Sequence, residues 1–439
     1  MAILSCWVLG ALQGAILILV PEMMLQGHLS AFELALPLSL GTFVFMCCSG
    51  WWGDLLDKRS LANQSLMSII RWVLLGFLVS QLSFLILLQF SQFQGLSLII
   101  GLCFARVLHG LFCSAIIPSA QLTLSHHDEK GEKLIWSSIA TNIGRLTAPL
   151  LTFVPVEINY FSLWFIAFVT CVAAVLAWWN SAAWKTSRII NEMTQSNLVQ
   201  SIHSTDHHKN KVVLIDSHGL NNQTLNADAL SFDVTSTTKI EKFSLSNNPL
   251  LLSVCTIAVL VTLFSSQLQF SLGPLLLAQF GNADLASKMT ASLLFAASAS
   301  ALVSLFLLYR PLSRSPILFI SVISVCFIAG SLLFVMQQHL IVAVILISAA
   351  LSMAPAWYTA LAIHASKSSK ARTSAAVSQG HTLGNVLGGL AGGLLLILGQ
   401  QSLLVSFILL MALILCAGGV VYHRGHRLNI SDQIIIAKS

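Results

Sequence analysis

Long apolar runs lie on both sides of a polar central stretch in this chain of 439 residues. A helix crosses the apolar core of a bilayer with about 20 mostly apolar residues. Runs of this kind predict an all-α integral membrane protein with twelve spans, at about residues 3–24, 32–53, 66–90, 95–122, 134–156, 159–180, 249–275, 286–309, 315–337, 339–364, 374–399 and 402–422. The first run begins almost at Met1, without a basic residue before it or an A-x-A cleavage site, so it predicts a helix and not a signal peptide.

The polar centre divides the predicted helices into two groups of six. We expect an N-terminal six-helix half (1–180), a cytoplasmic flexible linker (181–248), a C-terminal six-helix half (249–422) and a cytoplasmic tail (423–439). The linker has no long apolar run, so it cannot bury enough apolar surface to fold alone. Its polar cluster offers possible metal ligands, but we prefer a solvated linker and expect no metal or cofactor: His203, Asp206, His207, His208 and His218.

Lys and Arg side chains follow every second predicted helix. They come after the second, fourth, sixth, eighth, tenth and twelfth helices, whereas the other loops have none except for Lys288 after the seventh. Cytoplasmic loops carry such an excess of basic residues, so the termini and the linker are predicted to be cytoplasmic. The net charge of +6 is therefore a topology signal and predicts no nucleic-acid partner.

The composition excludes an ordinary soluble protein. Hydrophobic residues make up 56% of the chain and charged residues only 9%, with a mean hydropathy of +0.84. A soluble domain has about a quarter of its residues charged, so most of the outer surface here must face lipid. The nine cysteines lie in apolar runs without metal-ligand spacing and are interpreted as packing residues.

The turn after the second helix carries a recognisable motif. It has the pattern G-x-x-x-D-[RK]-x-G-[RK]-[RK] in part, with Leu55 and Asp57 at the positions of a basic residue and a glycine; the matching residues are Gly50, Asp54, Lys58 and Arg59. The fourth helix has L-x-x-x-R-x-x-H-G, in which Arg106 and Gly110 match and His109 replaces a glutamine. Together these motifs resemble those of the major facilitator superfamily. The resemblance, taken with the helix pattern, covers the whole chain except the linker and tail.

The resemblance implies two six-helix halves, a substrate site near the membrane midplane between them, and gating by the first motif. The halves also look alike, because Gly144-Arg145 in the fifth helix corresponds to Gly384-Asn385 in the eleventh. Glycines at small-xxx-small spacing predict close helix packing at Gly110, Gly384, Gly388 and Gly392.

Basic and titratable side chains lie in mid-membrane without an acid. Arg106, His109 and Arg145 are in mid-helix, where an unpaired charge is costly and points to function, and His381 is near that depth. A cavity with these side chains should be positive and favour an anionic substrate. Neutral side chains that complete the predicted site are Gln13, Gln267, Gln269, Tyr358, Gln379 and Asn385, and proton coupling is assigned to Glu22, Glu33 and Arg106.

These features predict a proton-coupled secondary transporter of the cell membrane, an exporter (antiporter) of a small anionic organic molecule such as a carboxylate siderophore, metabolite or drug. The alternatives are an importer (symporter) of an organic anion and a membrane signalling or interaction protein without transport. No P-loop, zincin or serine-hydrolase motif occurs, so neither an enzyme nor an ATP-driven pump is expected. A monomer in a bacterial inner membrane is expected.

Overall fold

The computed structural model describes residues 2–61, 67–89, 93–125, 135–155, 160–179, 249–365 and 370–438, and every structural statement below concerns these residues. The predicted linker, with its histidines, and the tip of the loop with Lys130 lie outside them. Within them all regular elements are helices: α1 (Ala2–Ile18), α2 (Val20–Gly27), α3 (Ala31–Leu61), α4 (Met67–Gln89), α5 (Gly95–Cys113), α6 (Ile116–Ser125), α7 (Ile135–Thr152), an unlabelled helix over Phe161–Trp179, α9 (Pro249–Phe280), α10 (Ala283–Val303), the π-helical turn η4 (Ser304–Leu308), α11 (Tyr309–Leu312), α12 (Pro316–Val335), α13 (Leu340–Ala365), α14 (Lys370–Ile397) and α15 (Gln400–Lys438).

Each of the twelve predicted spans is helical. Ten helices of the described part are long and apolar enough to cross a membrane, and α1 with α2, which are bent by 50° at a short break, make an eleventh span. The remaining predicted span, α7, is the fifth in chain order and is not among them, because polar side chains such as Asn142 and Arg145 lower its mean hydropathy. The chain is thus a multi-pass membrane protein in which one span is unusually polar.

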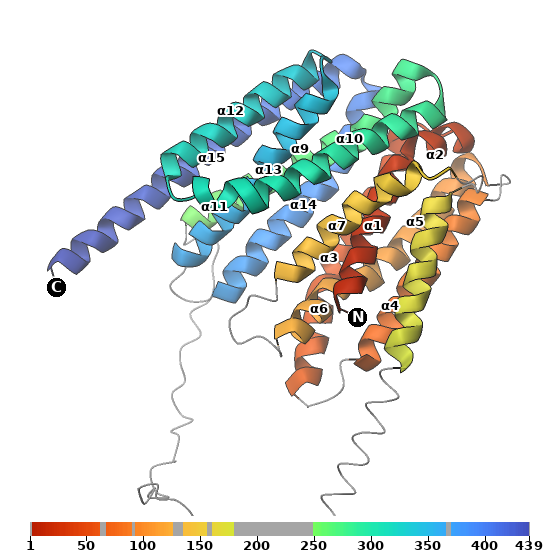
Figure 1. Ribbon diagram of the computed structural model, residues 1–439, viewed down its shortest axis with the longest axis horizontal. Coiled ribbons are helices and arrows are strands. Elements are labelled where there is room, and N and C mark those ends of the chain that lie inside the picture. Colours follow the sequence, from red (N-terminus) through yellow and green to blue (C-terminus); the bar gives the residue numbers. More distant parts are fainter. Residues whose placement is uncertain are drawn as a thin grey trace, which may run out of the picture. The chain divides into compact units, whose positions relative to one another are not determined.

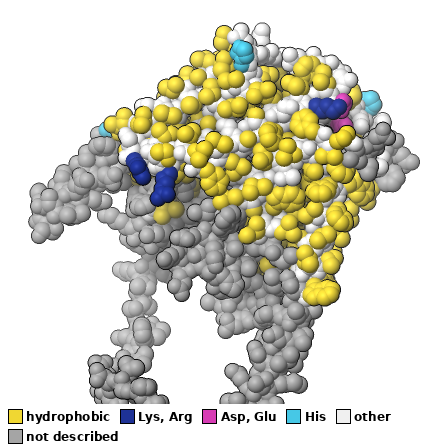
Figure 2. Space-filling model, in the orientation of Figure 1, with side chains coloured by type: hydrophobic (Ala, Val, Ile, Leu, Met, Phe, Trp, Pro, Cys, Tyr) yellow, Lys and Arg dark blue, Asp and Glu magenta, His cyan; other side chains and the backbone are white. Residues whose placement is uncertain are grey.

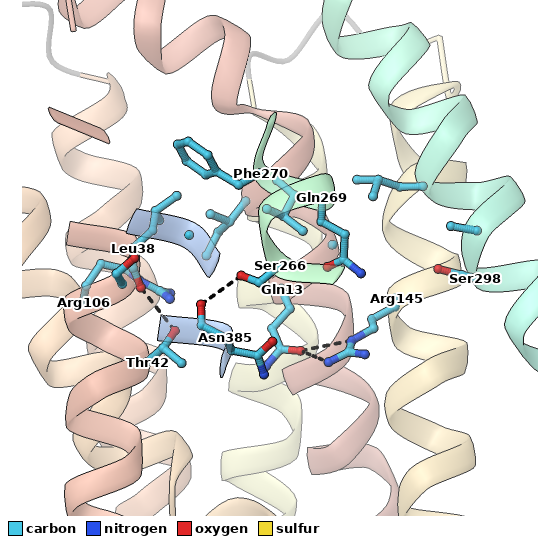
Figure 3. Close-up of a pocket in the computed structure, with 17 residues that line it drawn as sticks. Gln13, Leu38, Thr42, Arg106, Arg145, Ser266, Gln269, Phe270, Ser298 and Asn385 are labelled. Carbon is cyan, nitrogen blue, oxygen red and sulfur yellow. Dashed lines mark hydrogen bonds between the residues drawn. The ribbon is translucent and has the colours of Figure 1, made fainter. Parts of the chain in front are cut away.

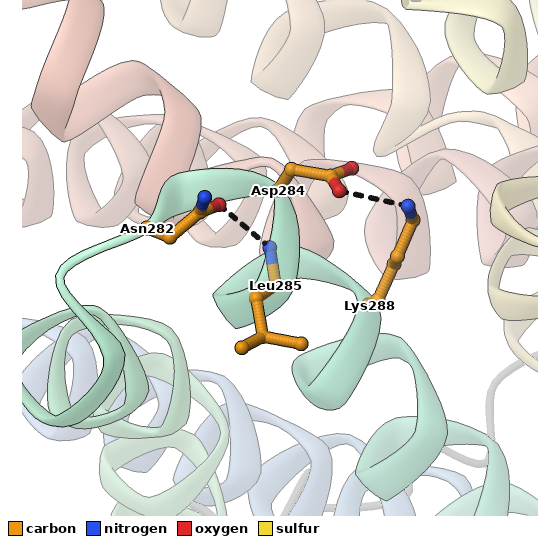
Figure 4. A network of polar contacts seen from close by, with 4 residues as sticks. All are labelled: Asn282, Asp284, Leu285 and Lys288. Atoms are coloured by element: carbon orange, nitrogen blue, oxygen red, sulfur yellow. Dashed lines mark hydrogen bonds and ion pairs between the residues drawn. The ribbon is translucent and has the colours of Figure 1, made fainter.

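Two helix starts in the outer region by the predicted topology are stabilised by side chains. At α3, Ser30 and Glu33 form a capping box, in which the Ser30 amide donates to the Glu33 carboxylate at 2.8 Å and the Glu33 amide donates to the Ser30 hydroxyl at 3.3 Å. At α10, the Asn282 carbonyl accepts from the Leu285 amide at 3.1 Å (Figure 4). One turn further, Lys288 pairs with Asp284 at 2.7 Å, so the one basic side chain that breaks the charge alternation is neutralised locally.

The helices pair in the same way in each half. In the N-terminal half α1 packs along α7, and in the C-terminal half α9 packs along α14 (Figure 1). Across the halves, α3 packs on α14 and α10 packs on α7. In each pair the second span of one half packs on the fifth span of the other half. The contacts between the halves are therefore repeated in the same way as the halves themselves.

Glycines bring these helices close together. A methyl group at Gly144 would lie 2.0 Å from the Trp7 carbonyl oxygen and 2.7 Å from the Ala11 amide nitrogen, and one at Gly384 would lie 2.3 Å from the Val259 oxygen and 3.0 Å from the Leu263 nitrogen. The partner atoms are four residues apart in both cases. Gly144 and Gly384 therefore occupy equivalent places in the two halves, as the comparison of their sequences predicts.

The exposed side chains suit a lipid environment. The face in Figure 2 is mainly hydrophobic, with few charged side chains on the coloured part. Large apolar residues project outward from several helices, among them Phe104 (63% exposed), Phe168 (66%) and Val325 (64%). Such an area of exposed apolar surface is unfavourable in water and favourable against acyl chains.

Candidate functional site

A cavity of about 210 Å³ lies between the two halves. Seven helices line it: α1, α3, α5 and α7 from the first half, and α9, α10 and α14 from the second. Five of them contribute pairs of residues four positions apart, which lie on one face of a helix: Gln13 and Leu17, Leu38 and Thr42, Ser266 and Phe270, Leu294 and Ser298, and Asn385 and Gly389. Each of these helices therefore turns one stripe of side chains toward the cavity.

Arg145 of α7 is positioned by α1. Its Nε and Nη2 atoms both donate to the Gln13 Oε1 atom, at 3.1 and 2.8 Å (Figure 3). Gly14, the residue after Gln13, lets the two helices approach, because a methyl group there would lie 3.1 Å from the Arg145 carbonyl oxygen. The guanidinium group is oriented by a neutral amide, so its positive charge is not compensated.

Arg106 of α5 reaches the cavity from the other side. The residue is only 9% exposed, and its buried Nε atom has no hydrogen-bond partner among the described residues. Its side chain packs on Gly41 of α3, where a methyl group would lie 2.9 Å from the Arg106 Nε atom. Buried polar groups almost always have a hydrogen-bond partner, so we expect this guanidinium group to bind an acceptor in the cavity.

The second half offers only neutral polar groups. The Ser266 hydroxyl donates to the Asn385 carbonyl oxygen at 2.9 Å, and the Gln269 amide donates to the Ser265 hydroxyl at 3.3 Å. The side-chain amide of Asn385 and the Ser298 hydroxyl have no hydrogen-bond partner among the described residues. No Asp or Glu of the described ranges lines the cavity. Asn385 follows Gly384 as Arg145 follows Gly144, so the equivalent positions carry a charge in one half and an amide in the other.

The cavity thus brings together five of the predicted site residues: Gln13, Arg106, Arg145, Gln269 and Asn385. The other predicted residues lie elsewhere. His109 is buried against Phe77, with ring centroids 5.3 Å apart. Gln267 is buried and donates to the Ser406 hydroxyl of α15.

Tyr358 and His381 interact with each other, with 3.3 Å between the hydroxyl and the His381 Nε2 atom and with stacked rings. Tyr358 lines a second, smaller and mainly apolar cavity inside the C-terminal half. Gln379 is exposed on α14, outside both cavities. His381 lies one helical turn from Asn385, on the same side of α14.

The acids assigned to proton coupling are outside the cavity as well. Glu33 is occupied with the cap of α3, and Glu22 is half-buried in α2. Close to Glu22, the Tyr160 hydroxyl donates to the side-chain Oε1 atom of Gln26. The role of either acid in coupling stays a prediction.

The gating motif lies at the end of α3, away from the cavity. Gly50 and Gly53 face open space, Asp54 and Lys58 are exposed, and the Arg59 side chain is outside the described set. The neighbouring Trp52 ties α3 to α5, because its indole donates to the Leu111 carbonyl oxygen at 2.7 Å. The glycines of the packing prediction lie at contacts between helices, Gly110 against α3, and Gly384, Gly388 and Gly392 against α9.

Sequence reasoning did not identify several residues of the cavity. Thr42, Ser266 and Ser298 are hydroxyl residues in apolar helices, where they commonly bond their own backbone and attract no attention. Leu38 and Phe270 supply an apolar surface beside the polar groups (Figure 3). The sequence repeat was the one feature that could have pointed to them. It places Asn385 of α14 where α7 has Arg145, and the helix packed against α14 is α9, which carries Ser266.

Solved structures of transporters share this arrangement of helices. A bacterial homologue of the human lysosomal transporter Spinster matches with 13% identity and a TM-score of 0.61, over 97% of this chain and 96% of that one. The nucleoside transporter NupG matches with 12% identity and a TM-score of 0.60, over 96% and 97%. The D-xylose–proton symporter matches with 12% identity and a TM-score of 0.59, over 96% and 95%.

No protein-family model and no curated protein sequence matches the chain. The structural likenesses therefore carry the comparison, and they extend over nearly the full length of both chains in each case. All three are transporters of the major facilitator fold, and this chain has that fold.

Proposed function

We propose that this chain, a membrane protein with the major facilitator fold, is a secondary active transporter of a small organic anion. The observation that carries the proposal is the charge of the central cavity: two arginines line it, and no acid does in the part of the chain that the structure describes. A positive cavity favours a negatively charged occupant. Its volume of about 210 Å³ is below the range usual for drug-sized ligands, which favours a small metabolite.

Proton-coupled export is the direction we propose, with Glu22, Glu33 and Arg106 as coupling residues. One of the similar structures is by its title a proton symporter, which supports proton coupling as the first mechanism to test. The basic loops support cytoplasmic termini and a cytoplasmic linker between two six-helix halves, and Asp284 removes the single exception at Lys288. We propose a monomer in a bacterial inner membrane.

Transport into inside-out vesicles tests the proposal. Vesicles from cells with and without the protein are given radiolabelled organic acids, and an interior-acid pH gradient is imposed. An exporter of the antiporter type should accumulate an anion in the vesicles only when the gradient is present. The variant with both Arg106→Gln and Arg145→Gln, at matched expression, should abolish accumulation. Accumulation that needs the opposite gradient would indicate an importer, and equal accumulation by the double variant would refute the anion site.

A further inference from the structure

The two positive charges of the cavity are separate and belong to the same half. Arg106 comes from α5 and Arg145 from α7, and Figure 3 shows them on opposite sides of the polar groups Gln13, Ser266 and Asn385. The C-terminal half adds only amides and hydroxyls. One anionic group seated at Arg145 would therefore leave Arg106 without a partner, and the reverse also holds.

Each arginine needs an anion of its own. Arg106 is about nine-tenths buried, and its buried Nε atom has no hydrogen-bond partner among the described residues. A buried charge without a counter-charge is costly, and Arg106 lines the cavity, so an anionic group in the cavity would offset that cost. Arg145 gives two of its five N–H groups to the single Gln13 oxygen and keeps three available. Gln13 is neutral and leaves the charge of Arg145 uncompensated.

We infer that the transported molecule is a dianion with one anionic group at Arg106 and the other at Arg145, joined by a short polar middle that lies against Ser266, Gln269 and Asn385. This inference rests on the proposed function and specifies its substrate class. The cavity volume of about 210 Å³ is below the range usual for drug-sized ligands, which favours a short molecule. A short dicarboxylate, or a molecule with one carboxylate and one phosphate, is of this size.

The placement of Arg106 and Arg145 in the same half has a consequence for selectivity. Alternating access in this type of transporter moves one half against the other. The spacing of Arg106 and Arg145 is set within the N-terminal half, by the packing of α5 on α3 and of α7 on α1, and does not depend on that movement. The dianion should therefore be held with the same spacing throughout the cycle, and affinity should depend sharply on the distance between its anionic groups.

Binding to the purified full-length protein in detergent tests the inference. Titration calorimetry is carried out with straight-chain dicarboxylates of three to six carbons, and with monocarboxylates of the same lengths. A second panel of phosphonocarboxylates and alkylphosphonates distinguishes carboxylate from phosphate-type groups. We expect one chain length to bind best, about tenfold or more tighter than its monoanionic counterpart, which is the effect of one charged hydrogen-bonded pair.

Two variants and a control locate the effect. Arg106→Gln and Arg145→Gln should each reduce the preference for the dianion to nearly one, whereas Arg106→Lys, which keeps the charge, should retain part of it. Arg310→Gln removes an exposed arginine outside the cavity and should leave the preference unchanged. Monoanions that bind as tightly as dianions of equal length would overturn the inference and leave the proposed function intact. Binding of neither panel to the folded protein would refute the proposed function itself.

Discussion

Replacing Gly384 by alanine is expected to force α14 away from α9. The added methyl group would lie 2.0 Å from the Thr262 Oγ1 atom and 2.3 Å from the Val259 carbonyl oxygen. The side chain of Thr262 can turn, but the Val259 oxygen belongs to a helix backbone. Ordinary contact begins at 3.4 Å, so the two backbones must separate by about 1.1 Å at this point.

The cost follows from overpacking of a close helix contact. Inserting atoms into a well-packed interior destabilises a protein by roughly 1–3 kcal/mol, and this backbone contact leaves no route for side-chain relaxation. Asn385 is the next residue, and its carbonyl oxygen accepts from Ser266 of α9 at 2.9 Å, so the same separation should break that hydrogen bond. We therefore expect Gly384→Ala to lower the unfolding temperature in detergent and also to weaken binding of organic anions.

Gly392→Ala is the matched control on the same helix face. A methyl group there would meet the Phe270 ring edge at 3.3 Å, a contact that a movement of a few tenths of an ångström relieves. Thermal unfolding of both variants by intrinsic fluorescence, followed by calorimetric binding, gives the comparison. If Gly384→Ala were as stable as Gly392→Ala, the tight α9–α14 contact would be absent in the membrane protein, and the equivalence of Gly144 and Gly384 would lose its support.

Four further predictions concern the cavity, the gate, the linker and the topology. Arg145→Lys keeps the charge but loses the pair of N–H groups that bond Gln13, whereas Arg145→Ala loses both. Calorimetry should therefore show weaker anion binding in the alanine variant than in the lysine variant, with an affinity roughly 10- to 150-fold below that of the wild type. Equal affinities would exclude this arginine from the site. Asp54→Asn should express normally but slow transport in vesicles, because the closed cytoplasmic side loses a charge partner; an unchanged rate would show that Asp54 is only a solvated acid. Replacement of residues 205–240 by a Gly/Ser segment of similar length should preserve transport, because a linker needs only reach; lost transport with normal insertion would give the histidine cluster a specific role. Cysteines introduced at Lys130 and Ser201 should react with an impermeant reagent only from the cytoplasmic side, and external labelling at position 201 would overturn the topology.

The positions of the helices could be predicted because the signal is local. About 20 consecutive apolar residues suffice to cross a bilayer, and each run can be recognised without reference to any other. The breaks inside the first and eighth spans could not be seen in this way. The α1–α2 break depends on a bend of 50° near Pro21, and η4 in the eighth span inserts a π-turn without a proline or glycine.

The membership of the cavity was only partly predictable. Arg106 and His109 are three residues apart in the same helix, and both are polar and in mid-membrane, yet Arg106 lines the cavity and His109 packs on Phe77. Gln267 and Gln269 differ in the same way, because Gln269 lines the cavity and Gln267 bonds Ser406 within its own half. A polar residue in a span must find a partner, but its sequence does not say whether that partner is another helix or a ligand.

The sequence by itself determined the class of the protein, the number and order of its helices and the excess of positive over negative charge in mid-membrane. Each of these depends on the transfer of residues from water to lipid, a free energy that is set by residue type. Only the tertiary structure decided that Arg106 and Arg145 share one cavity, that both belong to the first half, and that the second half faces them with Asn385 in the place of an arginine. Those facts depend on how each helix is rotated about its axis, and the rotation is set by glycine contacts between helices far apart in the chain.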